Sequence, residues 1–175
     1  MAKPDTPRLR ARQLLNRLGI QSAPIPVERI AKALSAQVRF SPFDDELSGM
    51  IYVKDGVPII GVNSLHHPLR QRFTIAHELG HLELHREMIE TAVHVDKDFP
   101  TNFPALMRDP KSATGTERVE IEANEFAAEL LMPEALIVQA LAGKQFDIED
   151  SRPIEELAKR FRVSKQALEY RIRNR

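Results

Sequence analysis

The chain has 175 residues, of which 42% are hydrophobic and 29% charged, with 25 basic and 25 acidic side chains. This is the composition of an ordinary soluble globular domain, with room for a small appendage. Cysteine is absent, which excludes disulfides and thiolate metal sites. No apolar run approaches the roughly 18 residues of a membrane span, and no apolar signal segment follows the first residues. We therefore expect a cytoplasmic protein without membrane contact, in which any metal is held by histidine and carboxylate.

The charges are unevenly distributed along the chain. Residues 1–39 contain 8 Lys or Arg against 2 Asp or Glu, and residues 151–175 contain 8 against 3, whereas residues 40–150 contain 9 against 20. Basic ends could meet nucleic acid or an acidic partner, and the plain alternative is a solvated surface. An acidic central region would suit a basic substrate such as a DNA-binding protein.

The first third of the chain predicts two helices and a small sheet. The apolar spacing favours helices over residues 8–18 and 27–35. Three strands are then expected, at residues 36–40, 47–53 and 57–62, and Asp55–Gly56 predicts a hairpin between the last two. We expect a three-stranded antiparallel sheet. Its strand at residues 47–53 would be an edge that aligns a substrate by strand addition.

The chemistry of the sequence is concentrated in a helix that opens near Pro68 and contains His77-Glu78-x-x-His81. Histidines four residues apart lie on one face of a helix, one turn apart, where both can bind the same zinc ion. Glu78, next to His77, is expected to act as the general base of metal-assisted hydrolysis. Gly80 within the motif suggests the close approach of another backbone, since alanine would form a better helix.

The third metal ligand has to come from elsewhere in the chain. His85 is eight residues beyond His77, a rise of about 12 Å, so both cannot bind one ion. On the next expected helix, which Pro133 ends, Glu120 shares a face with Asn124 and two alanines. Glu120 would complete a His₂Glu site, with Glu122 as the alternative, and Asn124 would bond a ligand imidazole and fix its tautomer.

Residues 91–116 separate the histidines from Glu120 and contain three prolines and little periodicity. A loop of this length in a small domain is often functional, so we expect it to border the site as a lid. His94 within it is a candidate transition-state donor, against the simpler interpretation of an exposed loop histidine.

The end of the chain predicts a short helix at 134–142 and then two helices, at 153–161 and 164–173, with Ser164 as the N-cap of the second. This succession of two short helices is typical of a helix-turn-helix pair, in which Lys165, Arg171 and Arg173 could bind phosphate. The alternative is structural, because the apolar positions of both helices provide a core face that could close the domain.

Two segments together, Arg70–His81 and Glu120–Pro133, closely resemble the ImmA/IrrE family of metallo-endopeptidases. The resemblance extends from about Arg8 to Arg173 and is weakest between Ile89 and Gly115. It implies one zinc ion per chain, with His77, His81 and Glu120 at the metal positions and Glu78 at that of the catalytic glutamate. Members of the family are described as intracellular proteases that cleave helix-turn-helix repressors, in mobile-element induction or DNA-damage responses.

We therefore interpret the sequence as an α+β, mostly helical, zincin-like peptidase, with a metallopeptidase domain at 1–150 and a C-terminal helical pair at 151–175 packed on it. Manganese is the alternative metal for a His₂Glu site. Two other hypotheses remain: a DNA-binding regulator with a structural metal, and a toxin–antitoxin-like partner whose site is silent. Glu78 argues against both, because a structural site needs no positioned base.

Overall fold

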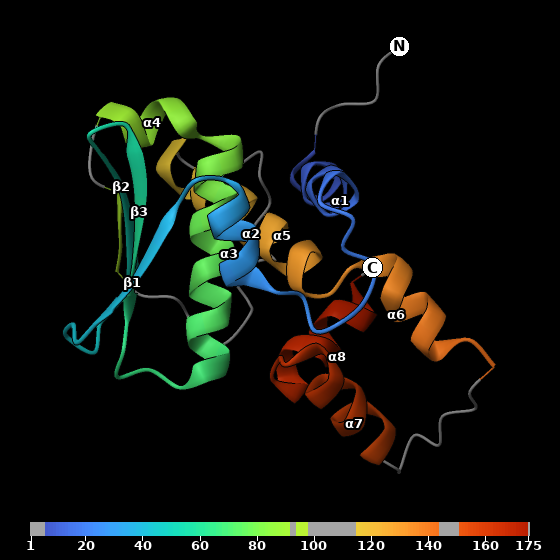
Figure 1. Cartoon of the computed structure of the whole chain (residues 1–175). Helices are drawn as coiled ribbons and strands as arrows, with labels where there is room; N and C mark the ends of the chain where they lie inside the picture. The colour runs from blue at the N-terminus through green and yellow to red at the C-terminus, as the bar shows by residue number, and fades with distance from the viewer. Residues whose placement is uncertain (1–5, 92–93, 98–114, 144–150, 175) are drawn as a thin grey trace.

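Helix α3 (Pro68–Leu84) runs through the centre of the molecule, with a small sheet on one side and helix α5 (Gly115–Leu131) on the other (Figure 1). The computed structural model describes residues 6–91, 94–97, 115–143 and 151–174. The fold is α+β and mostly helical, as expected from the sequence. The remaining elements, in chain order, are α1 (Pro7–Arg17), α2 (Val27–Ala33), β1 (Gln37–Ser41), β2 (Leu47–Lys54), β3 (Val57–Asn63), α4 (Arg86–Thr91), β4 (His94–Lys97), α6 (Glu134–Leu141), α7 (Arg152–Phe161) and α8 (Lys165–Arg173).

Local signals fix the ends of several elements. Pro68 occupies the first turn of α3, where its missing N–H costs nothing, and His67 Nδ1 accepts a hydrogen bond from the Leu69 N–H. The β2–β3 hairpin turns at Asp55 and Gly56, which both have positive φ, as this two-residue turn requires. The Ser164 hydroxyl caps α8 by accepting from the Ala167 N–H. The hairpin and this cap are confirmed.

The sheet is mixed, so the predicted antiparallel arrangement is wrong for its first strand. The strand order is β1-β3-β2-β4, and β1 runs parallel to β3. The chain passes from β1 across β3 to β2, and the buried Asn63 holds this connection: its amide donates to the carbonyls of Phe43, Asp44 and Leu47. Apolar alternation in the sequence shows which face of a strand is buried, but not which strand is its neighbour.

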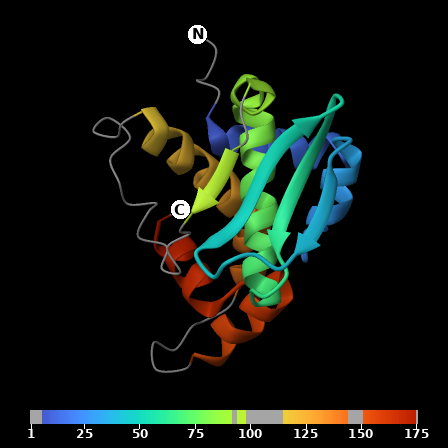
Figure 2. The same cartoon turned by 90° about the vertical axis from the view of Figure 1, so that its left-hand side faces the viewer.

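A fourth strand, β4, lies within the segment expected to be a loop. It pairs antiparallel with residues 47–51 of β2, so β2 is flanked by β3 and β4 (Figure 2). The prediction that β2 is an edge open to strand addition is therefore wrong along these residues, because β4 already occupies the backbone groups on that side. Of the predicted lid at 91–116, residues 92–93 and 98–114 lie outside the described residues, and so does the side chain of His94.

Helices α3 and α5 approach each other closely at Gly80, as the glycine in the motif suggested. A Cβ atom at Gly80 would lie 3.1 Å from both the Cα atom and the carbonyl oxygen of Ala123, and 3.2 Å from the Phe126 ring. The nearest obstacles belong to the backbone of α5, which cannot move away independently. The distance between the two central helices is thus set by one glycine facing one alanine.

Gly80→Val is expected to lower the free energy of unfolding by about 1–3 kcal/mol, the usual cost of overpacking a core. Chemical denaturation measures the change. Ala135→Val, at an exposed position of α6, serves as the control for a β-branched residue in a helix, which costs about 0.7 kcal/mol or less. Unfolding of Gly80→Val at the wild-type denaturant concentration would contradict the close contact.

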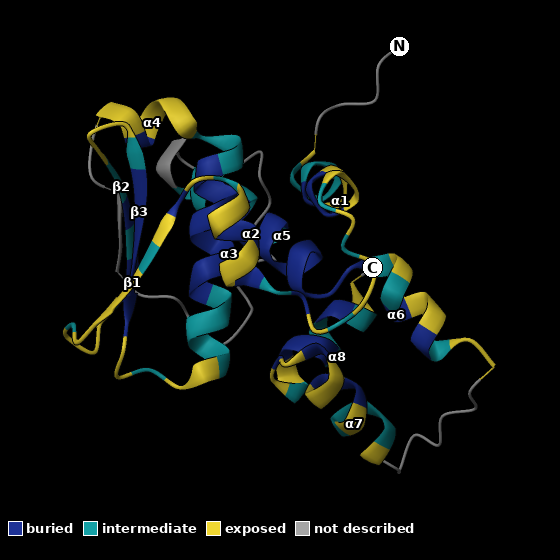
Figure 3. Cartoon of the chain, in the orientation of Figure 1, coloured by how far each residue is buried: buried dark blue, intermediate teal, exposed yellow. Residues whose placement is uncertain are grey.

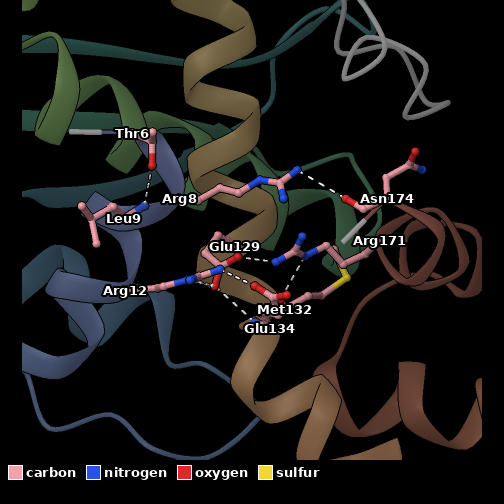
Figure 4. A network of polar contacts seen from close by, with 9 residues as sticks. All are labelled: Thr6, Arg8, Leu9, Arg12, Glu129, Met132, Glu134, Arg171 and Asn174. Atoms are coloured by element: carbon pink, nitrogen blue, oxygen red, sulfur yellow. Dashed lines mark hydrogen bonds and ion pairs between the residues drawn. The ribbon is translucent and has the colours of Figure 1, made fainter. Parts of the chain in front are cut away.

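The C-terminal pair α7 and α8 packs onto the same hydrophobic core as α3 and α5, with Leu157, Phe161 and Leu168 buried in it (Figure 3). Arg171 of α8 is 3% exposed and forms an ion pair with Glu129 of α5, which is 1% exposed (Figure 4). The prediction that Arg171 could meet phosphate is therefore wrong, because its guanidinium is turned into the protein. The division into domains at residue 150 stays a prediction.

Arg72 connects the C-terminal helices α7 and α8 to the rest of the fold. Its guanidinium donates from α3 to the carbonyl oxygens of Ile25, at 3.0 Å, and Arg162, at 3.3 Å. Burial lowers the pKa of Arg72 to about 10, and the positive charge of Arg162 acts in the same direction. One side chain thus joins the start of α2, the N-terminal half of α3 and the end of α7.

Among the described helices, none has the length and apolar character needed to cross a bilayer.

Candidate metal centre

Helix α3 places the two motif histidines together in the interior. His77 and His81 are 0% and 2% exposed, and their Nε2 atoms lie 2.9 Å apart. The stretch Thr74–Leu82 is buried without interruption, because α3 is covered by the sheet on one side and by α5 on the other. The imidazoles are therefore held by packing on both sides of their helix.

Glu120, on α5, completes a cluster with these histidines. Its Oε2 atom lies 3.1 Å from His77 Nε2, and its Oε1 atom lies 3.5 Å from His81 Nε2. The Glu120 side chain is 30% exposed, so it is the solvent-accessible member of the cluster, whereas both histidines are buried. Among the described residues, these three form the group that could hold a metal ion.

The spacing of the three side chains fits a tetrahedral metal ion. Bonds of about 2.0–2.1 Å place neighbouring ligand atoms about 3.3 Å apart, close to the 2.9, 3.1 and 3.5 Å separations of this cluster. Asn124 adds a second indication, because its Oδ1 atom accepts a hydrogen bond of 2.9 Å from His77 Nδ1. With the proton on Nδ1, the Nε2 lone pair of His77 faces the other two ligand atoms, as metal binding requires.

Glu78 lies next to this cluster on α3, between the helix and strand β2. It is fully buried, and a Cβ atom at Gly49 of β2 would lie 3.2 Å from Glu78 Oε1 and 2.4 Å from Thr74 Cγ2. Only glycine leaves room for both side chains. Gly49 was not identified from the sequence, although a glycine inside an expected strand is a signal of close approach by another group.

The other candidates from the sequence lie outside the cluster. His85 is the C-cap of α3, and its Nε2 atom lies 3.4 Å from Glu122 Oε2. Glu122 also accepts a hydrogen bond from Arg118 one turn earlier on α5. The alternative ligand Glu122 is thus paired with His85, while Glu120 faces the motif histidines.

Comparison with known proteins gives a family, a curated protein of similar sequence and a solved structure of similar fold. The model of the family Peptidase_M78, described as the IrrE N-terminal-like domain, matches residues 31–173. The chain is 36% identical over 118 residues to the radiation response metalloprotease IrrE of Deinococcus radiodurans, a match that covers 65% of this chain and 30% of that protein.

Among solved structures, the fold is similar to that of a Mycobacterium tuberculosis transcriptional regulator. The TM-score is 0.60 at 19% sequence identity, over 93% of this chain and 45% of the other. At this identity the likeness shows the fold alone. The chain spans less than half the length of each of these two proteins.

Proposed function

Because the chain belongs to the Peptidase_M78 family of IrrE N-terminal-like domains, we propose that it is a zinc-dependent metalloendopeptidase. The observation that carries the proposal is the convergence of His77, His81 and Glu120 from two helices, with Glu78 beside them. A structural metal needs ligands, whereas a hydrolytic site also needs a base within reach of the reacting water.

The three ligands would hold the ion through two neutral imidazole Nε2 atoms and one carboxylate. When bound, zinc supplies Lewis-acid chemistry: it polarises the carbonyl of the scissile peptide bond and makes water more acidic. The hydrogen bond to Asn124 keeps the proton of His77 on Nδ1, so the Nε2 lone pair would be available to bind the ion. This fixes the orientation of one ligand ring before metal or substrate arrives.

Glu78 moves the proton in the proposed reaction. Its carboxylate accepts a proton from the attacking water and returns it to the leaving amine, so one group acts as base and then as acid. Burial between α3 and the Gly49 backbone limits the orientations of this carboxylate. The scissile bond would lie on the side where Glu120 is open to solvent.

The substrate we propose is a helix-turn-helix transcriptional repressor, cleaved in the cytoplasm during mobile-element induction or a DNA-damage response. The resemblance to the ImmA/IrrE family supports this class of substrate, and the similarity to a metalloprotease named for radiation response supports the stress role. The acidic middle of the chain, with 20 Asp or Glu against 9 Lys or Arg at residues 40–150, suits a basic DNA-binding protein.

Metal content tests the proposal directly. Elemental analysis of the purified protein, after incubation with zinc and removal of excess, is expected to give one zinc per chain. Glu120→Ala should lose most of this metal, because a ligand is gone, whereas Glu122→Ala should keep it, since Glu122 contacts His85 instead. A wild-type chain that binds no divalent metal when it is supplied would overturn the metallopeptidase proposal.

A further inference from the structure

One cation lies on the same face of α3 as the proposed base. Arg70, Thr74 and Glu78 follow one another at intervals of four residues, so their side chains line one side of the helix. Arg70 is partly exposed and lies near the N-terminal end of α3. It is the first residue of this line, about 12 Å of helix before Glu78.

A bulge in β2 brings Ser48 to this cation. Leu47 and Gly49 pair with Lys97 and Asp96, which are adjacent in β4, so Ser48 is the extra residue. A bulge redirects a side chain out of the normal alternation. The fully buried Ser48 hydroxyl here accepts a hydrogen bond of 2.8 Å from Arg70 Nη2. The next residue, Gly49, is the one that lies against Thr74 and Glu78.

The guanidinium of Arg70 has no carboxylate partner in the described part of the chain. Unlike that of Arg72, which donates to two backbone carbonyls, it also leaves one buried N–H without an acceptor there. The Arg70 guanidinium donates instead to a neutral group, the Ser48 hydroxyl. Arg12, by contrast, contacts the carboxylates of Glu129 and Glu134. A guanidinium taken partly out of water is stabilised best by a carboxylate, which it can bind through two parallel hydrogen bonds.

We propose that Arg70 is a specificity-determining residue that binds a carboxylate of the substrate peptide. The inference rests on the proposed peptidase function. Arg70 lies about 10 Å of helix from the ligand His77, and an extended peptide advances about 3.3 Å per residue. The carboxylate therefore belongs about three residues from the scissile bond. It is either an Asp or Glu side chain or the C-terminal carboxylate of the chain, since both present the same group.

Cleavage of a proteome-derived peptide library by the zinc-loaded wild-type protein, read by mass spectrometry, tests this subsite. Asp and Glu are expected to be enriched at one position about three residues from the cleaved bond. Cleavage at a constant distance from the peptide end would instead identify the C-terminal carboxylate. In Arg70→Met the enrichment should disappear. For the best acidic peptide, kcat/KM should then fall about tenfold or more, while its amide counterpart is cleaved as by wild type.

The ratio of kcat/KM for the acidic peptide to kcat/KM for its amide counterpart distinguishes a substrate-binding role of Arg70 from a purely structural one. If Arg70 only supports the β2 bulge, Arg70→Met lowers cleavage of both peptides equally, and the inference is wrong. Arg70→Lys keeps the charge but not the paired geometry and should retain an intermediate preference. Arg86→Met, which removes a 56% exposed arginine of α4, is the matched control and should keep the full acid preference.

A binding measurement keeps the inference testable without hydrolysis. The probes are acetylated and amidated alanine hexapeptides with one Asp, or one Asn as control, at each position in turn, and one hexapeptide with a free C-terminus. They are titrated into ¹⁵N-arginine-labelled Glu78→Gln protein. The Arg70 Nε–Hε signal, assigned by its loss in Arg70→Met, should shift with the carboxylate probes and not with Asn.

The two measurements distinguish failure of the subsite from failure of the function. Cleavage without acid preference and without the Arg70 shift would overturn the subsite and leave the peptidase standing. An Arg70 shift in a protein that cleaves no peptide would keep the carboxylate site and overturn its role in peptide hydrolysis. Absence of both cleavage and shift would overturn both proposals.

Discussion

Glu78→Gln is expected to lower kcat for peptide hydrolysis by about 10²–10⁴-fold, the usual contribution of general acid–base catalysis. Glutamine has nearly the same shape as glutamate but cannot take up the proton of water. The three metal ligands are unchanged, so the variant should bind zinc at the wild-type level. Cleavage of the peptide library measures the rate, and elemental analysis measures the metal.

The combination of lost hydrolysis and retained metal is what identifies Glu78 as the base. Loss of both would show that the substitution disturbs the metal centre, since Glu78 is fully buried next to His77. Glu87→Gln, at an exposed position of α4, makes the same chemical change away from the site and should leave kcat unchanged. Hydrolysis by Glu78→Gln at the wild-type rate would rule out the proposed role.

Arg171→Met is expected to lower the free energy of unfolding by about 3–5 kcal/mol, the cost of removing one partner of a buried ion pair. The Glu129 carboxylate would stay in the interior with Arg12 as its remaining cation. Burial lowers the pKa of Arg171, and the carboxylate of Glu129 opposes this shift, so Glu129 stabilises the charged form of Arg171. Arg171 also donates to the Met132 carbonyl, at 3.2 Å, where α5 ends (Figure 4).

Chemical denaturation of single and double variants tests this interpretation. Arg171→Met combined with Glu129→Met removes both charges and should recover much of the lost stability, because the buried carboxylate is then gone. Arg86→Met breaks the exposed Arg86–Glu90 pair, whose side chains are 56% and 52% exposed, and should change stability by less than about 1 kcal/mol. If Arg171→Met were as mild as this control, the ion pair would have no role in holding α8 on α5.

Local sequence signals were sufficient to predict those features of the structure that depend on residues close together in the chain. The spacing of His77 and His81 places both on one helical face, and the turn residues Asp55 and Gly56 define the hairpin by their positive φ. The spacing of Glu120 and Asn124 likewise places both on one face of their helix, although the approach of this face to the distant motif histidines was decided by the tertiary structure. These predictions succeeded because helix and turn geometry depends on residues only a few positions apart.

The sequence by itself therefore determined the α+β character, most helix boundaries and the side chains from which a metal centre can be built. The tertiary structure alone decided which strands pair: β1 runs parallel to β3, and β4 covers β2. It also decided that Arg171 meets Glu129, and that Arg70 meets Ser48 rather than a carboxylate of the described chain. The physical reason is that these contacts join segments many residues apart, and no local periodicity records which distant group will share the same buried space.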